Sequence, residues 1–208
     1  MSSIPQLMSG RALDHGIALL VDHGGTNSSK MYVGGQANAD VAAGTVINGD
    51  GEGTTETETT EYTVPANTLV AGSTIRCKFY VHCPSGNSSD TTQVGLRFGS
   101  NTTASGNTGI ETAAADLDNS GAVVVGDAVV QIRTAGASGT AIMFGTIAMD
   151  TVTTGIALSH DESGALATFA VDTTVANYLS VTITLGSTNA SMIAQSEAFI
   201  VDIVNPST

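Results

Sequence analysis

Two Asp-His pairs lie close together near the start of the chain, at Asp14-His15 and Asp22-His23. A carboxylate beside an imidazole can orient a metal ligand or a general base. Adjacent side chains on an extended chain point in opposite directions, however, so neither pair is well placed to act as a unit. The other histidines are scattered, and there is no Cys/His cluster. The spacing therefore predicts no metal site.

Asp22 also belongs to the stretch ALLVDHGGTNSSKMYV at 18–33. An apolar run followed by Asp-x-Gly-Gly-Thr resembles the first phosphate loop of sugar kinases of the actin-like ATPase class, in which glycines let the backbone approach phosphate. The matching positions are Asp22, Gly24, Gly25 and Thr26. Such kinases need two α/β domains and a second phosphate loop, and this chain has neither the length nor the pattern. We interpret the motif as a chance product of a Gly/Thr-rich sequence.

Acidic residues gather in the stretch GDGEGTTETETTE at 49–61. Calcium binding by Asp50, Glu52, Glu56 and Glu58 is one interpretation, but their spacing matches no known calcium loop. Thr favours strands, and glutamates alternating with it would line one solvent-facing side. The favoured prediction is an acidic edge strand, whose charges discourage unwanted strand addition.

No residue pattern in the chain indicates catalysis. No Gly-x-Ser-x-Gly follows an apolar strand, and no acid is paired with a base. The sequence therefore predicts that the protein is not an enzyme and uses no cofactor. A carbohydrate-binding or adhesin module remains an alternative of a different class. It would need an exposed aromatic platform, whereas Phe and Tyr make up 4% of the chain, Trp is absent, and the aromatics fall mostly on predicted core faces.

The charge balance limits the partners. The 208 residues carry 19 acidic and 6 basic side chains, a formal charge of −13. Such a surface repels phosphate backbones and anionic lipids, so we expect no direct nucleic-acid or membrane binding. The first apolar run, 17–21, is too short to span a bilayer. The first ten residues carry no secretory signal, so a soluble protein made inside a cell is expected.

The clearest structural signal lies between Glu61 and Gly99, where apolar and polar residues alternate. This period of two predicts strands with one face on a core and the other toward water. The predicted inward residues are Ile75, Cys77, Phe79, Val81 and Cys83 in the first run, then Thr92, Val94, Leu96 and Phe98 in the second. The outward residues are Arg76, Lys78, Tyr80 and His82, then Gln93, Gly95 and Arg97.

The two cysteines, Cys77 and Cys83, lie on the same predicted strand. At roughly 3.3 Å per residue their Cα atoms would be about 20 Å apart, beyond the reach of a disulfide. We predict buried free thiols, which suits a reducing cytoplasm.

Further strands are expected at 122–125, 128–133, 140–149, 166–172, 178–185 and 198–204. A turn or bulge is expected at Gly126-Asp127, and one short helical turn near 112–117. Short strands with frequent turn signals predict an all-β fold, a jelly roll or antiparallel β-sandwich of about eight strands. We place this sandwich at residues 51–208. Residues 1–50, rich in Gly, Ala and Asn, are expected to form an N-terminal arm or edge hairpin that packs on another surface.

A family resemblance extends over about residues 55–204. The segments TTEYTVPANTLVAGSTIRCKFYV, DTTQVGLRFG and VDTTVANYLSVTITLGSTNASMIAQSEAFIVDIV are separated by a Gly-rich middle. This succession of strands and turns resembles minor structural proteins of tailed bacteriophages. It contains no catalytic signature, and residues 1–50 are outside it.

The resemblance implies a jelly-roll protein of the virion that forms a homotrimer. The favoured role is a capsid cement or decoration protein, which binds the major capsid protein on the outer capsid surface and stabilises the head after assembly in the host cytoplasm. The alternative role is a tail, baseplate or head-fibre component. In the cement role, buried apolar contacts and strand addition by the N-terminal arm would join neighbouring capsid proteins.

Overall fold

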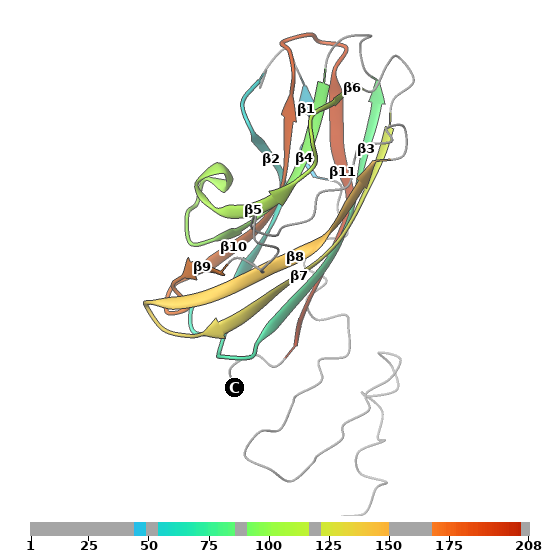
Figure 1. Cartoon of the computed structure of the whole chain (residues 1–208). Helices are drawn as coiled ribbons and strands as arrows, with labels where there is room; N and C mark the ends of the chain where they lie inside the picture. Colours follow the sequence, from blue (N-terminus) through green and yellow to red (C-terminus); the bar gives the residue numbers. More distant parts are fainter. Residues whose placement is uncertain (1–43, 49–53, 86–90, 117–121, 150–167, 205–208) are drawn as a thin grey trace, which may run out of the picture.

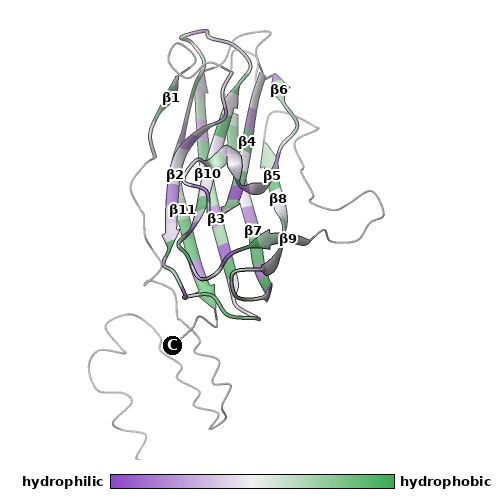
Figure 2. Ribbon diagram, turned by 90° about the vertical axis from the view of Figure 1, so that its left-hand side faces the viewer, coloured by the Kyte–Doolittle hydropathy of each residue, from purple (hydrophilic) through white to green (hydrophobic). Residues whose placement is uncertain are grey.

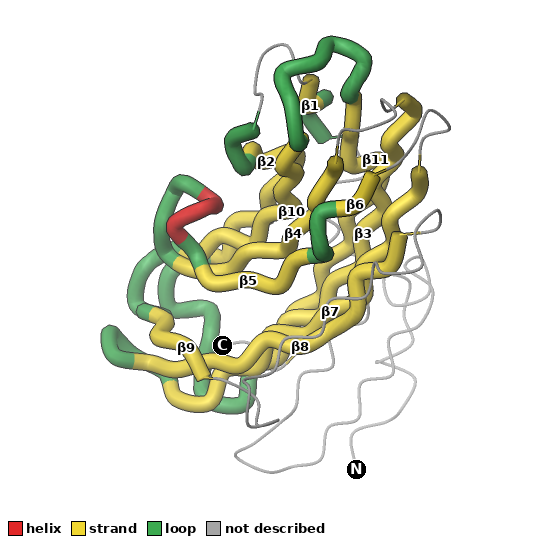
Figure 3. The backbone as a smooth tube through the Cα atoms, turned by 45° about the horizontal axis from the view of Figure 1, so that its top comes forward, coloured by secondary structure: helices red, strands yellow, loops and turns green. Residues whose placement is uncertain are grey.

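The strands of the chain pair into two antiparallel sheets that pack face to face (Figure 1). This computed structural model describes residues 44–48, 54–85, 91–116, 122–149 and 168–204, and the structural statements below concern these residues. The predicted all-β sandwich is confirmed. Within the described part of the chain, the only helix is the short 3-10 turn Ala104–Gly106, drawn red in Figure 3.

Sheet A has six strands in the spatial order β1-β11-β3-β7-β8-β9, and sheet B has the order β2-β10-β4-β5, with β6 pairing β4 as well. The strands of sheet A are β1 (Ile47–Asn48), β11 (Ile193–Val204), β3 (Thr74–Ser85), β7 (Ala122–Thr134), β8 (Gly139–Met149) and β9 (Thr168–Val171). Those of sheet B are β2 (Thr57–Val64), β10 (Asn177–Leu185), β4 (Thr91–Gly99), β5 (Thr108–Glu111) and β6 (Ala115–Asp116).

The strand order is that of a jelly roll. A jelly roll has eight strands, and here we number them one to eight along the chain as β1, β2, β3, β4, β5, β7, β10 and β11. In this numbering, the spatial order of sheet A begins with the first, eighth, third and sixth strands. Sheet B then holds the second, seventh, fourth and fifth. Strands β8 and β9 are inserted between the sixth and seventh, and they widen sheet A at the side of β7.

The core lies between the sheets and follows the alternation of the strands, visible along the ribbon in Figure 2. The inward residues predicted on β3 are all buried, and Phe79 stands opposite Phe199 of β11. Across the sandwich, Phe98 of β4 meets Phe169 of β9 edge to face, with ring centroids 6.5 Å apart. These contacts join the two sheets through apolar burial.

Cys77 and Cys83 are both buried and free, which confirms the prediction. Burial raises the pKa of the Cys77 thiol to about 12, although the backbone oxygen of Ala128 accepts a hydrogen bond from it. The thiol therefore stays protonated near neutral pH. A protonated buried thiol packs as a small apolar group and is a poor nucleophile.

Strand β7 corrects one prediction. The expected break at Gly126-Asp127 does not occur, because β7 pairs with β3 in register through both residues. Gly126 stands opposite Phe79, and a Cβ atom at Gly126 would lie 2.1 Å from that ring. Glycine is needed here to admit the phenylalanine, so it marks a close approach within a continuous strand.

The connection after β4 corrects a second prediction. A helical turn is expected near 112–117, but the described residues 112–116 form none, and Ala115–Asp116 form strand β6 against β4. The helical turn that is present lies earlier, at Ala104–Gly106. The local alanine content favoured a helix, but pairing with an existing strand edge outweighs that weak preference.

Residues 44–48, the described end of the segment predicted to be an arm or edge hairpin, pack on the sandwich and include its edge strand β1. Ile47 is 1% exposed and pairs with Ala194 of β11. The backbone N–H of Gly44 donates to the Ser196 oxygen at 2.6 Å, and that of Thr45 donates to the Thr59 oxygen at 2.7 Å. This segment therefore binds both sheets along one side. Residues 1–43 and 49–53 lie outside the described residues, so the remainder of the arm stays a prediction.

Candidate functional site

Most residues with a suggestive chemical pattern lie outside the described part of the chain. These include both Asp-His pairs, the phosphate-loop motif at 22–26, and Asp50 and Glu52 of the calcium interpretation. Glu56 and Glu58 are described, and so is His82, which is exposed as predicted. Among the described residues, no three His, Cys, Asp or Glu side chains come together in a way that could hold a metal ion. The two outer faces of the sandwich remain as candidate sites.

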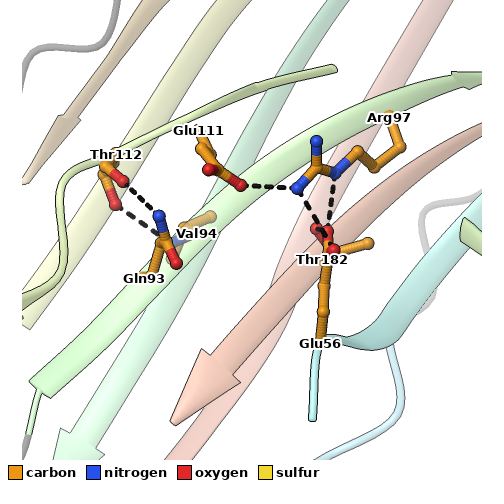
Figure 4. A network of polar contacts seen from close by, with 7 residues as sticks. All are labelled: Glu56, Gln93, Val94, Arg97, Glu111, Thr112 and Thr182. Atoms are coloured by element: carbon orange, nitrogen blue, oxygen red, sulfur yellow. Dashed lines mark hydrogen bonds and ion pairs between the residues drawn. The ribbon is translucent and has the colours of Figure 1, made fainter. Parts of the chain in front are cut away.

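The outer face of sheet B is organised around Arg97 of β4 (Figure 4). Its guanidinium donates two hydrogen bonds to Glu56, from Nε to Oε1 at 2.6 Å and from Nη2 to Oε2 at 3.1 Å. Nη2 also donates to Glu111 of β5. The Thr182 hydroxyl of β10 donates to Glu56 at 2.7 Å. The cluster thus connects the start of β2 with three neighbouring strands.

Local sequence makes room for this cluster. Arg97 stands directly opposite Gly109 of β5, where a Cβ atom would lie 2.4 Å from Cδ of Arg97. Because Gly109 has no side chain, the arginine lies flat over the sheet and reaches both carboxylates. Its side chain is only 17% exposed, and that of Glu56 is 19% exposed. Farther along β4, Gln93 donates to the backbone oxygen of Thr112 at 2.8 Å (Figure 4).

Two further glutamates lie next to this cluster on strand β2. The pKa of Glu61 is raised, first by partial burial and then by the neighbouring charge of Glu58. Hydroxyl donors oppose that shift, since Ser180 and Thr63 donate to Glu61 at 3.4 and 3.5 Å. Of the glutamates predicted to line an edge strand, Glu58 and Glu61 lie on β2, which is at the edge of sheet B. Glu56 lies just before β2 and is bound to Arg97, and Glu52 is outside the described residues.

The chemistry open to the Arg97 cluster is limited. The arginine is held by two carboxylates, so it is not free to receive an anion. Both carboxylate oxygens of Glu56 accept hydrogen bonds from Arg97 or Thr182, so this side chain is already occupied within the fold. We interpret the cluster as a polar clamp that joins the strands of sheet B.

The outer face of sheet A differs in kind. We define it by three rows of outward residues across β11, β3, β7 and β8, which the pairing register places side by side. The rows are Ala198-Tyr80-Val125-Ala148, Ile200-Lys78-Asp127-Thr146 and Asp202-Arg76-Val129-Phe144. Tyr80, Val125, Phe144 and Ile200 are 37%, 51%, 37% and 49% exposed. Most of the exposed large apolar side chains in the described residues are therefore on this one face.

Charged groups are balanced on the outer face of sheet A. Lys78 forms an ion pair with Asp127 at 3.2 Å, and Arg76 stands opposite Asp202. Farther along β7, exposed Arg133 donates to Gln131 at 3.2 Å. Exposed Glu197 lies at a bulge of β11 beside this face. The face is close to neutral in a chain whose formal charge is −13.

The sequence predicts the part of this face that lies on β3, but not its extent over the neighbouring strands. The outward direction of Arg76, Lys78, Tyr80 and His82 was predicted and is confirmed. The outward direction of Phe144 is not predicted by the apolar run at 140–149, because apolar residues fall on both faces of β8. Only the pairing of β3 with its neighbouring strands turns separate residues into one patch.

Comparison with known proteins identifies no family. No protein-family model matches the chain, and no curated protein matches it. Among solved structures, the legume lectin-like domain from Entamoeba histolytica is similar at 11% identity and a TM-score of 0.28, with 68% of this chain and 74% of that chain covered. That degree of likeness carries no conclusion about function. In the described residues, no helix has the length and hydropathy needed to cross a membrane.

Proposed function

We propose that this chain is a virion structural protein of a tailed bacteriophage, in the role of a capsid cement protein on the outside of the head. It acts by protein–protein contact and catalyses no reaction. The observation that carries the proposal is the outer face of sheet A, which is nearly neutral and exposes aromatic and aliphatic side chains. Exposed apolar patches on soluble proteins mark sites of association.

The sequence resemblance supplies the phage context. The resembling segments fall on β2 to β4 and on β9 to β11, which include two of the strands of the outer face of sheet A. A jelly roll also occurs in many viral capsid proteins, but that is an analogy at the level of the fold alone. The partners in this role are the major capsid protein and other copies of the chain. The N-terminal arm, if it adds a strand to a capsid protein, would supply a second contact.

The test of this function is the number of copies in a particle. Purified phage particles are analysed by quantitative mass spectrometry, and this chain is counted relative to the major capsid protein. Hundreds of copies per particle are expected for a cement protein that covers the head. About a dozen copies would place it in the tail, the baseplate or the vertices and overturn the cement role. Complete absence from particles would overturn the virion function.

The contribution of the arm is tested by a truncation that respects the fold. A variant that begins at residue 44 keeps Ile47 in the core and keeps both backbone contacts of residues 44–45. We expect it to fold with an unchanged melting temperature and to bind stripped particles at least tenfold more weakly than the full chain. Equal binding of both forms would refute the arm as an anchor. A variant lacking residues 1–50 is unsuitable, because it loses strand β1.

A further inference from the structure

We infer that the outer face of sheet A is the contact between two copies of this chain, which pair face to face about a two-fold axis. This inference deepens the proposed function, because it names the partner at the same face. It rests on that function only for its biological setting, since self-association is a property of the purified chain.

Electrostatics favours a second copy at this face over other regions of the surface. Two chains with a formal charge of −13 each repel one another, and the repulsion is weakest where the facing surfaces are neutral. The described basic residues are Arg76, Lys78, Arg97 and Arg133, and all but Arg97 lie on or beside the outer face of sheet A. The outer face of sheet B instead carries Glu56, Glu58, Glu61 and Glu111 around its single arginine.

The pattern of side chains is self-complementary. A two-fold axis parallel to the strands, between β3 and β7, places β3 of one copy over β7 of the other. Lys78 then faces Asp127 of the second copy, and Tyr80 faces Val125 of the second copy. The existing pair of Lys78 and Asp127 becomes a four-charge cluster of alternating sign. Each contact occurs twice, as an isologous interface requires.

The size of the face is sufficient for a dimer of moderate affinity. All four strands are paired over the eight residues Thr74–Val81 of β3 and their partners. With strands spaced by about 4.8 Å and a rise of about 3.3 Å per residue, the flat area is about 510 Å² per copy. Two copies would bury about 1,000 Å², which is the roughly 1,000 Å² expected of a specific interface. Its centre would be apolar, with Tyr80, Val125 and Ile200 removed from water.

The experiment measures the mass of the full chain in solution by size-exclusion chromatography with light scattering, over about a hundredfold range of concentration. We expect the wild-type chain to have the mass of two chains at high concentration. Val125→Glu and Ile200→Glu should each shift it to one chain, because each adds a charge to the apolar centre of the interface. Val125 and Ile200 are about half exposed, so neither change disturbs the core.

Charge reversal separates the interface from any effect on folding. Lys78→Glu alone and Asp127→Lys alone should each give the mass of one chain, because like charges then face each other across the two-fold axis. The double variant Lys78→Glu/Asp127→Lys restores both pairings and should regain the mass of two chains. Thr63→Glu, which adds the same charge at an exposed position on sheet B, is the matched control and should leave the mass unchanged.

Several results would overturn the inference. One is a wild-type chain with the mass of one chain at every concentration, and another is an assembly that Val125→Glu and Ile200→Glu both leave intact. The mass of three chains, as the sequence resemblance implies, would overturn the two-fold arrangement. The proposed function fails separately. A chain that is single in solution but present in hundreds of copies per particle keeps the cement role, and a paired chain absent from particles keeps only the interface.

Discussion

The two outer faces of this sandwich use the same residue types in opposite ways. On sheet B, Arg97 lies flat over Gly109 and binds Glu56 and Glu111, so its charge is compensated by two carboxylates of the same chain. On sheet A, Arg76 and Lys78 point outward from a single strand among aromatic and aliphatic side chains. The polar groups of one face are therefore paired and shielded from water, whereas the ion pair and the apolar side chains of the other face are exposed.

This difference separates residues that stabilise the fold from residues that could bind a partner. Polar groups that are paired and shielded from water contribute to stability, and removing one partner leaves the other unsatisfied. Exposed ion pairs such as Lys78–Asp127, whose side chains are 70% and 63% exposed, contribute little to stability. We therefore expect substitutions on sheet B to affect unfolding and substitutions on sheet A to affect association.

The largest contrast is expected between two arginines. Arg97→Ala should lower the free energy of unfolding by about 2–3 kcal/mol, because Glu56, whose side chain is 19% exposed, then loses its cation in a largely shielded place. Arg76→Ala, the matched change on sheet A, should stay within about 0.5 kcal/mol of wild type. Urea denaturation of both variants measures the difference. Equal losses would show that the two faces contribute alike to stability.

A smaller effect is expected at Thr182, which is 1% exposed and donates to Glu56. Thr182→Val keeps the volume and removes the hydroxyl, so the loss should be about 1 kcal/mol. In the background of Arg97→Ala, the loss should change by about 0.5 kcal/mol or more, because both residues bind Glu56. Strict additivity in this double-mutant cycle would contradict a single clamp. Thr146→Val, at an exposed site on sheet A, is the control and should have no measurable effect.

Much of the fold could be predicted because its signal is local. Alternation along β3 and β10 identifies their inward faces within a few residues, and turn residues separate the strands. The motif Pro-Ala-Asn-Thr-Leu precedes β3, and there Asn67 adopts a positive φ of 61° in the turn, as asparagine readily does. These features require no knowledge of distant parts of the chain.

The remaining features depend on partners far apart in the sequence. Arg97 and Glu56 are 41 residues apart, and Thr182 and Glu56 are 126 apart, so no local pattern indicates the clamp. The sequence near Gly126 predicts a break, because the ring of Phe79, which requires a glycine there, lies on the neighbouring strand. The pairing of Ile47 cannot be predicted locally, because a two-residue strand is recognisable only by its partner β11. The outer face of sheet A likewise exists only once four strands are aligned.

The smallest expected effect tests whether sheet B is also the more pH-sensitive face. The pKa of Glu61 is raised in the folded chain, so the ionised form is less favourable there than in the unfolded chain. The penalty is absent below the unfolded pKa, where the group is protonated in both states, and it reaches its full size above the folded pKa. Glu61→Gln should therefore raise the melting temperature by about 1 °C at neutral pH and leave it unchanged near pH 3. Glu197→Gln, on the exposed bulge of β11, is the control, and a gain from Glu61→Gln that is equal at both pH values would contradict the ionisation penalty.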